Sequence, residues 1–226
     1  MRLSISLEKG LVVVIPKSIS KRQAAKLIPE FVMDKQYWIN DTFKKLQAQK
    51  QLKPSIEQCQ LPETVSLLAL EQVFSITYRH LPDRRLTLLH QTECQLEISG
   101  DLQNRKVIFA LLEQFYKEYA RFYLQQRLTQ LSKESGLAYN RMTIRAQKTR
   151  WGSCSAKKNI SLNYRLLFIN KSLMDYILLH ELVHTVHMNH SKAFWSSLEL
   201  MMPDARNRDQ RVNQITKSLP CWIFYK

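Results

Sequence analysis

Residues 180–190 read HELVHTVHMNH, and this stretch contains four of the six histidines of the 226-residue chain. His180 and His184 are four residues apart, so on a helix both imidazoles lie on one face, where a zinc ion can bridge them. Glu181 is rotated by about 100° from His180 around the helix axis, so it borders the metal and can accept a proton from water. The stretch predicts a helix with two metal ligands and a general base.

The third ligand depends on how the chain continues after the helix. A catalytic zinc has three protein ligands and keeps its fourth position for water. His190 lies six residues after His184, about 9 Å further along a continued helix, so it reaches the metal only if the chain turns back. Asn189 favours a turn, because asparagine tolerates left-handed backbone at a helix end. We therefore favour His190 as the third ligand, with His187 and Glu199 as alternatives.

The residues around the motif argue against a chance match. A capping-box pattern at Ser172 and Asp175 begins the predicted helix. Apolar residues then cover nearly every side of it: Ile177, Leu178, Leu179, Leu182 and Val183. His180, Glu181 and His184 would therefore be buried polar groups that need partners, and a metal supplies one.

The first hundred residues predict a β-rich lobe with one helix. Alternating apolar residues indicate a hairpin over 3–15, and short β-like runs recur between residues 65 and 98. The helix begins at Ser20, and Pro29 can divide or delay it.

Residues 101–226 predict a helical core with a small β-sheet, so the fold class is α+β. A long helix begins at Arg105 and ends near Gly136. Its apolar stripe comprises Val107, Leu111, Leu112, Phe115, Tyr119, Phe122 and Leu131. Two strand-like segments follow, MTIRAQ (142–147) and ISLNYRL (160–166), on either side of a predicted loop at 149–159.

The net charge of +15 makes polyanions plausible partners, with a generic solubility charge as the alternative. Residues 1–138 contain 20 Lys/Arg and 14 Asp/Glu, whereas residues 139–226 contain 14 and 5, so the excess is denser in the C-terminal part. Six residues of that part form the predicted polyanion-binding surface: Arg141, Arg145, Lys148, Arg150, Lys157 and Lys158.

Two further features bear on the protein's environment. The apolar run Leu11 to Ile15 is too short for a signal peptide or a membrane span, so we expect a cytoplasmic protein without membrane contact. The four cysteines are far apart and form no C-x-x-C pair, so we expect reduced thiols. We interpret Cys154 as a buried turn residue rather than a ligand or nucleophile.

Three segments, TRWGSCSAKKNISLNYRL, HELVHTVHMNHSKAFW and MMPDARNR, closely resemble the YgjP-like metallopeptidase family, relatives of the SprT-like zincins. The resemblance runs over most of the chain. It implies a zincin-like core, one Zn²⁺ per chain on His180, His184 and His190, and Glu181 as general base. His187 stands where the related metzincin signature has glycine, so the chain departs from that signature.

The expected activity is zinc-dependent hydrolysis of peptide bonds, in which the metal activates water and Glu181 carries the proton. Asn163, Tyr164 and Arg165 are expected to contact a substrate that lies along an edge strand formed by ISLNYRL. The resemblance to SprT-like enzymes and the basic surface together suggest substrates associated with nucleic acid.

Two alternatives use the same metal. In the first, the protein hydrolyses a phosphoanhydride, and the Arg/Lys residues hold the phosphates of a nucleotide. In the second, it is a non-catalytic nucleic-acid-binding module with a structural zinc. The second is disfavoured, because a structural site has no need of a base such as Glu181.

Overall fold

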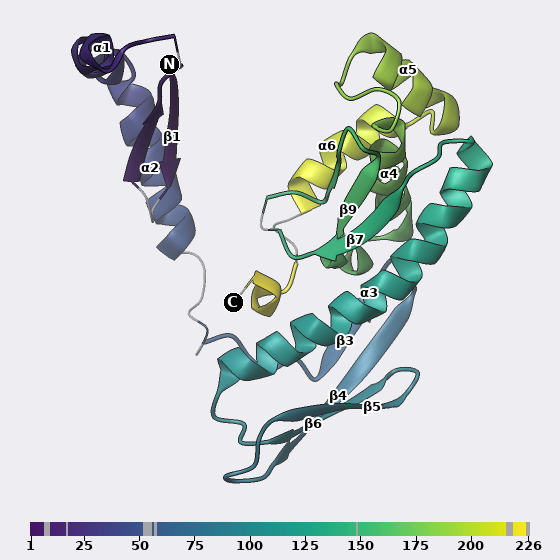
Figure 1. Ribbon diagram of the computed structural model, residues 1–226. Coiled ribbons are helices and arrows are strands. Elements are labelled where there is room, and N and C mark those ends of the chain that lie inside the picture. The colour runs from purple at the N-terminus through teal and green to yellow at the C-terminus, as the bar shows by residue number, and fades with distance from the viewer. Residues whose placement is uncertain are drawn as a thin grey trace. The chain divides into compact units, whose positions relative to one another are not determined.

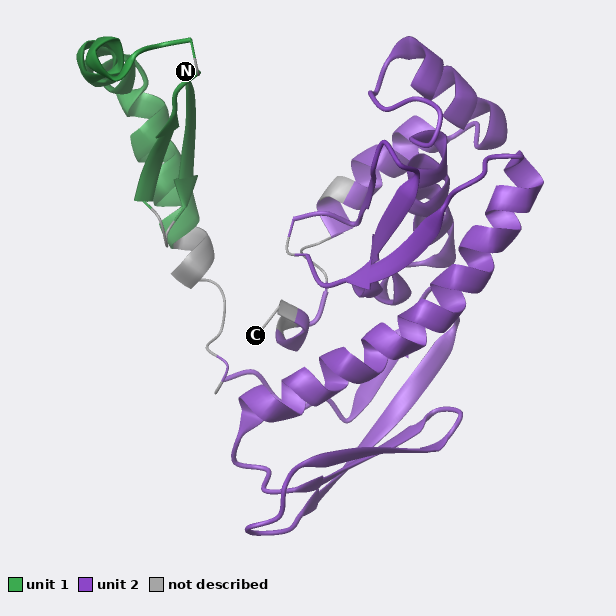
Figure 2. Cartoon of the chain, in the orientation of Figure 1, with its two compact units in different colours: residues 1–55 green, residues 56–226 purple. Residues whose placement is uncertain are grey.

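The chain forms two compact units, residues 1–55 and 56–226, which Figure 2 colours separately. The structure is a computed structural model that describes residues 1–6, 10–16, 18–51, 56, 58–147, 149–215 and 219–224. The predicted boundary near residue 100 differs from this division. The reason is that the strands after residue 63 pack on the long helix of the second unit, so they belong to that unit.

The first unit is a hairpin followed by two helices. Strands β1 (Arg2–Ser6) and β2 (Gly10–Val14) pair antiparallel, as the alternation of apolar residues predicts. The helices are α1 (Lys21–Asp34) and α2 (Gln36–Gln51). Ser20 caps α1 by accepting a hydrogen bond from the backbone N–H of Gln23 at 3.4 Å. Pro29 lies inside α1 without ending it. The helix is interrupted at Lys35 instead, so the structure has two helices where one was predicted.

The second unit begins with a four-stranded sheet in the order β3-β4-β6-β5. Its strands are β3 (Thr64–Leu67), β4 (Gln72–His80), β5 (Thr87–Thr92) and β6 (Gln95–Gly100). β4 and β6 are parallel, and the other two pairs are antiparallel. The helix α3 (Arg105–Ser135) crosses one face of this sheet (Figure 1), where the Phe74 ring meets the edges of Phe115, Tyr116 and Tyr119.

Helix α3 forms the centre of the second unit. It runs from its N-cap Asn104 to Gly136, whose φ of 69° is the left-handed conformation that ends a helix. The predicted stripe is wrong at Val107 and Phe122, which are 41% and 59% exposed. The four-stranded sheet covers one side of α3, and the C-terminal elements cover another side. The buried residues of α3 therefore do not lie along the single stripe that was predicted. They are Ile108, Phe109, Leu112, Tyr116, Ala120, Leu124, Leu128 and Leu131.

A second, three-stranded sheet has the order β7-β9-β8. Its strands are β7 (Arg141–Arg145), β8 (Gly152–Cys154) and β9 (Asn159–Asn163). β9 is parallel to β7 and antiparallel to β8. The predicted loop at 149–159 therefore contains a strand. The predicted strand ISLNYRL ends at Asn163 and continues as the 3-10 helix η1 (Tyr164–Phe168).

The remaining elements are α4 (Lys171–Val183), α5 (Lys192–Met201), α6 (Ala205–Ile215) and the 3-10 helix η3 (Cys221–Phe224). The N-cap of α4 is Asn170, not the predicted Ser172, because the Asn170 side chain accepts the Leu173 N–H at 3.0 Å. Asp175 forms no capping box and instead holds Arg127 of α3 through two hydrogen bonds of 2.8 Å. Within the described ranges, no helix combines the length and apolar character needed to span a membrane.

The cysteines differ from the expectation in one respect. Cys59, which is 1% exposed, is disulfide-bonded, so the prediction of reduced thiols is wrong at this position. Spacing along the chain does not reveal which thiols meet in the fold. Cys94 and Cys154 are free thiols, and the Cys221 side chain lies outside the described residues.

Candidate metal centre

Three imidazoles converge at the end of α4. The Nε2 atom of His184 lies 3.1 Å from Nε2 of His180 and 3.2 Å from Nε2 of His190, and the Nε2 atoms of His180 and His190 are 3.0 Å apart. His180 and His184 are half-buried, and His190 is exposed. The structure therefore brings together the three histidines that the motif and the resemblance single out.

The turn that His190 requires follows directly after α4. Hydrogen bonds from the N–H groups of Thr185 and Val186 to the carbonyls of Leu182 and Val183 tighten the last turn of the helix. The carbonyl of His187 then accepts a hydrogen bond from Nδ1 of His184 at 2.8 Å. This bond ties the chain after α4 to His184 and so helps to bring His190 back toward the other two histidines.

The two alternative ligands lie outside the histidine cluster. Nε2 of His187 faces the hydroxyl of Ser197 at 3.1 Å. The carboxylate of Glu199 pairs with Arg206, whose Nε lies 2.5 Å away. Among the described residues, only the three histidines form a group of potential ligands that could hold one metal ion.

The donor set fits zinc. Tetrahedral zinc with bonds of about 2.0–2.1 Å requires donors about 3.3–3.4 Å apart, close to the observed 3.0–3.2 Å. Burial, followed by the charges of His184 and His190, lowers the pKa of His180 to about 3. Burial also lowers the pKa of His184. Metal ligands must be neutral imidazoles, so this environment favours the form that binds a metal.

Glu181 lies beside the cluster with a carboxyl group that is nearly enclosed. It is 5% exposed, and its Oε2 atom is buried without a hydrogen-bond partner in the described part of the chain. Burial raises the pKa of Glu181 to about 8, and the nearby Arg150 opposes the shift. An orphaned carboxylate oxygen of this kind is a natural acceptor for a proton from a bound water molecule.

Gly152 of β8 packs directly against Glu181. A Cβ atom at position 152 would lie 2.6 Å from Oε1 and 2.7 Å from Cγ of the glutamate, closer than real Cβ contacts allow. Glycine therefore lets the strand approach the carboxyl group. The sequence predicts that Gly152 lies in the loop at 149–159, whereas the structure shows a strand residue that packs against Glu181.

Three residues at the cluster, Phe194, Tyr176 and Asp209, were not predicted from the sequence. Phe194 of α5 is fully buried, and its ring centroid lies 4.6–4.9 Å from those of all three histidines. The hydroxyl of Tyr176 lies 3.2 Å from Nδ1 of His180 and 2.9 Å from Oδ1 of Asp209. Tyr176 lies four residues before His180 on the same helix, and this spacing could have predicted that the two side chains are in contact. Nothing in the sequence pattern indicated Asp209.

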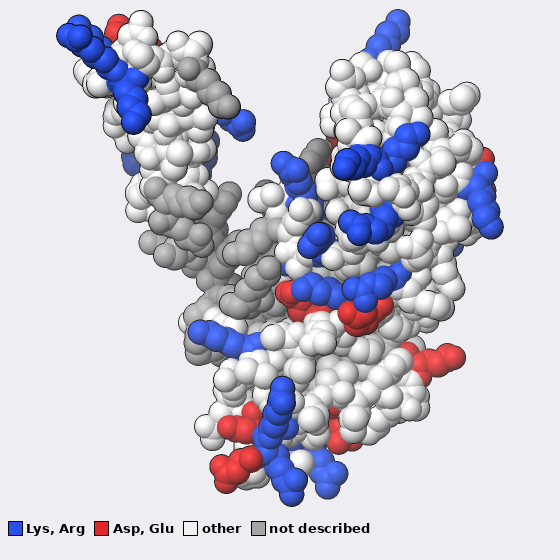
Figure 3. All heavy atoms as spheres, viewed as in Figure 1, with Lys and Arg blue, Asp and Glu red and all other residues white. Residues whose placement is uncertain are grey.

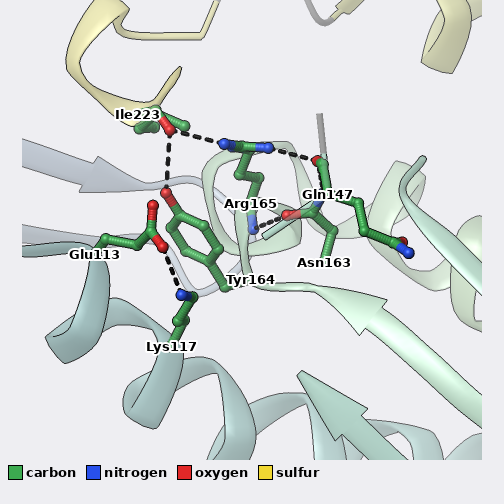
Figure 4. A network of polar contacts seen from close by, with 7 residues as sticks. All are labelled: Glu113, Lys117, Gln147, Asn163, Tyr164, Arg165 and Ile223. Carbon is green, nitrogen blue, oxygen red and sulfur yellow. Dashed lines mark hydrogen bonds and ion pairs between the residues drawn. The ribbon is translucent and has the colours of Figure 1, made fainter. Parts of the chain in front are cut away.

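The predicted substrate residues belong to the interior. Asn163, Tyr164 and Arg165 are 3%, 0% and 2% exposed. Nδ2 of Asn163 donates to the carbonyls of Gln147 and Arg150, at 2.7 and 2.8 Å. Figure 4 shows Arg165 between the carbonyls of Gln147 and Ile223, and the Tyr164 hydroxyl also donates to Ile223. These residues tie η1 to the β7–β8 connection and to η3, so the expectation that they contact substrate is not supported.

The predicted polyanion-binding residues are exposed where the structure describes them. Arg141 and Arg145 belong to β7, and Arg150, Lys157 and Lys158 lie beside β8. Lys148 lies outside the described residues. Figure 3 shows Lys and Arg side chains over the part of the second unit that contains β7 and β9, with most of the Asp and Glu side chains nearer to α3 and the larger sheet.

Cys154 is a half-buried strand residue rather than the turn residue that was predicted. Burial, and then the nearby Glu181 carboxylate, raises the pKa of its thiol to about 11. The thiol therefore stays protonated at neutral pH, which does not suit a nucleophile.

Comparison with known proteins gives the following matches. A family model described as "YgjP-like, metallopeptidase domain" matches residues 1–215. A solved structure described as the metallopeptidase zymogen of Pyrococcus abyssi abylysin is 28% identical, over 41% of this chain and 92% of that one. Its TM-score of 0.37 is too low for a comparison of folds. A search of curated proteins found no match.

Proposed function

Because the chain belongs to the YgjP-like metallopeptidase family, we propose that it is a zinc-dependent hydrolase that cleaves peptide bonds. The convergence of three Nε2 atoms within 3.0–3.2 Å, beside a buried carboxyl group, carries this proposal. A site that served only to stabilise the fold would have no use for the unpartnered Oε2 atom of Glu181.

His180, His184 and His190 would hold one zinc ion through their Nε2 atoms. The bound zinc would lower the pKa of water and polarise the carbonyl group of the scissile bond. Glu181 receives the proton that the attacking water loses, and then delivers it to the leaving amine. Gly152 and Phe194 position the carboxyl group and the imidazoles.

The edge strand for the substrate is β8 rather than the predicted ISLNYRL. Among the strands that the structure describes, β9 has neighbours on both sides, whereas β8 pairs with β9 alone. The Asn163 N–H bonds to the Trp151 carbonyl and the Ser155 N–H to the Asn159 carbonyl. Because an antiparallel ladder alternates, the polar backbone groups of Gly152 and Cys154 point to the opposite, open edge. A peptide that adds to this edge would lie next to Glu181.

The activity is tested with the zinc-loaded protein and an unfolded protein as substrate. We expect Glu181→Gln to retain zinc and to lose at least about 10²-fold in turnover, the usual contribution of a general base. Glu199→Gln is the matched control, because Glu199 lies outside the cluster, and it should keep both zinc and activity. Full turnover by Glu181→Gln, or release of phosphate from nucleoside triphosphates without peptide cleavage, would overturn the proposal.

We propose in addition that the surface formed by β7 and the chain around β8 binds a polyanion, namely nucleic acid. Residues 135–174 contain eight Lys/Arg and no Asp/Glu. The charges on this surface are therefore not neutralised by neighbours in the sequence, and such a surface attracts a phosphate backbone. Binding there would place the hydrolase close to proteins that are bound to nucleic acid.

The nucleic-acid proposal is tested by fluorescence anisotropy of labelled duplex DNA over a range of salt concentrations. The double variant Arg141→Gln, Arg145→Gln should bind more weakly, with a salt slope reduced by up to about 2. The control Lys44→Gln, Lys45→Gln removes the same charge from α2 and should leave the slope unchanged. Weak binding by the unmodified protein at low salt, with no salt dependence, would refute the proposal.

A further inference from the structure

A short hydrogen-bond chain leads from His180 away from the metal cluster. The hydroxyl of Tyr176 lies 3.2 Å from Nδ1 of His180 and 2.9 Å from Oδ1 of Asp209. We propose that Asp209 and Tyr176 are positioning residues that keep a proton on Nδ1 of His180, so that its Nε2 atom always presents a lone pair to the metal. This inference rests on the metal centre but not on the bond that the enzyme cleaves.

The direction of each hydrogen bond follows from counting protons. An ionised carboxylate can only accept, so the single hydroxyl proton of Tyr176 must point to Asp209. The hydroxyl oxygen then has only acceptor capacity left for His180. Nδ1 must therefore donate, which places the imidazole proton there and leaves Nε2 free of hydrogen.

His184 offers a comparison within the same site. Its Nδ1 faces the backbone carbonyl of His187 at 2.8 Å, and a carbonyl can only accept. The backbone therefore fixes the tautomer of His184 directly. Tyr176, by contrast, can donate or accept, so His180 depends on a carboxylate one step further out, on α6.

The buried position of the Asp209–Tyr176–His180 hydrogen bonds explains why they should matter for metal binding. Tyr176 is 2% exposed, so water cannot easily replace its hydroxyl beside His180. If the proton moved to Nε2, the imidazole would present an N–H to the metal instead of a lone pair. Loss of such outer partners usually weakens metal binding by about 10–100-fold.

The test uses the full chain and two variants, Asp209→Asn and Tyr176→Phe. An asparagine side chain can donate or accept a hydrogen bond. Asp209→Asn therefore keeps the size of the side chain but no longer forces the Tyr176 hydroxyl to donate toward residue 209. We expect the zinc Kd, measured by competition with a chromophoric chelator, to rise by about 10–100-fold in both variants. Nitrogen-15 NMR of the metal-free protein should show the His180 proton on Nδ1 in the unmodified chain and a mixture of tautomers in Asp209→Asn.

The control is Asp204→Asn, which removes one negative charge just before α6 at a solvent-exposed ion pair with Arg208. It separates the role of the hydrogen-bond chain from a general loss of negative charge, and its zinc Kd should stay within about twofold. Thermal unfolding of the metal-free variants shows whether each one folds. Unchanged zinc affinity and an unchanged His180 tautomer in a folded Asp209→Asn protein would overturn the inference, whatever the substrate of the enzyme.

Discussion

Replacement of Gly152 by alanine should reduce catalysis without removing the metal. The added Cβ would lie 2.6 Å from Oε1, 2.7 Å from Cγ and 2.9 Å from Cδ of Glu181. An ordinary contact needs about 3.5 Å, so the carboxyl group must move by roughly 0.5–1 Å. Glu181 is 5% exposed and has little space to move into. Misplacement of a catalytic group by about 1 Å can cost on the order of 10²-fold in rate.

The assay compares kcat for a peptide substrate, zinc content and thermal stability in Gly152→Ala and in Ser153→Ala, the neighbouring position of the same strand. We expect kcat to fall by about 10²-fold in Gly152→Ala. Zinc content should stay near one per chain, because the three atoms nearest to the added methyl group all belong to Glu181 and none to the histidines. Ser153→Ala should retain kcat. The reasoning is refuted if Gly152→Ala keeps the kcat of the unmodified protein, or if it loses zinc as well as activity.

Three further predictions concern the metal and the stability of the fold. His184→Ala removes the histidine whose Nε2 lies 3.1–3.2 Å from Nε2 of both His180 and His190. Zinc content measured after dialysis should therefore fall from about one per chain to near zero. Retention of one zinc would contradict the role of His184 as a ligand. Asp175→Asn removes the carboxylate that accepts two hydrogen bonds from Arg127 and so links α4 to α3. The free energy of unfolding, measured with urea, should fall by about 1–3 kcal/mol. An unchanged urea midpoint would mean that the ion pair does not stabilise the fold. Asn163→Ala removes two hydrogen bonds to the carbonyls of Gln147 and Arg150, so the free energy of unfolding should fall by about 2–4 kcal/mol. If the variant instead lost affinity for peptide and kept its stability, Asn163 would contact substrate, as the sequence predicted.

The features that the sequence predicted are those that depend on short-range spacing. The separation of four residues between His180 and His184 places both imidazoles on one helix face in any fold that keeps the helix. The end of α3 at Gly136 and the hairpin of β1 and β2 are equally local. The return of the chain to His190 was predicted, but the reason was wrong: Asn189 is not among the described non-glycine residues with positive φ, and the chain turns through the backbone hydrogen bonds of Thr185 and Val186 instead.

The features that were missed depend on tertiary contacts. Strand β8 has three residues, one of them Gly152, and it exists only because β9 offers its edge. Asn163 and Arg165 resemble exposed site residues in the sequence, yet backbone carbonyls distant along the chain satisfy them in the interior. No pattern in the sequence could show that Ile223 would supply one of those carbonyls.

Phe194 links the metal centre to the folding of the C-terminal helices. Its ring packs against all three imidazoles, so the position of α5 at the end of α4 helps to fix where the three candidate ligands lie. Zinc that binds only the docked arrangement stabilises it by mass action, by about 2.7 kcal/mol when free zinc is 100 times its Kd. Metal supply would then set how much of the enzyme is assembled as well as how much is active.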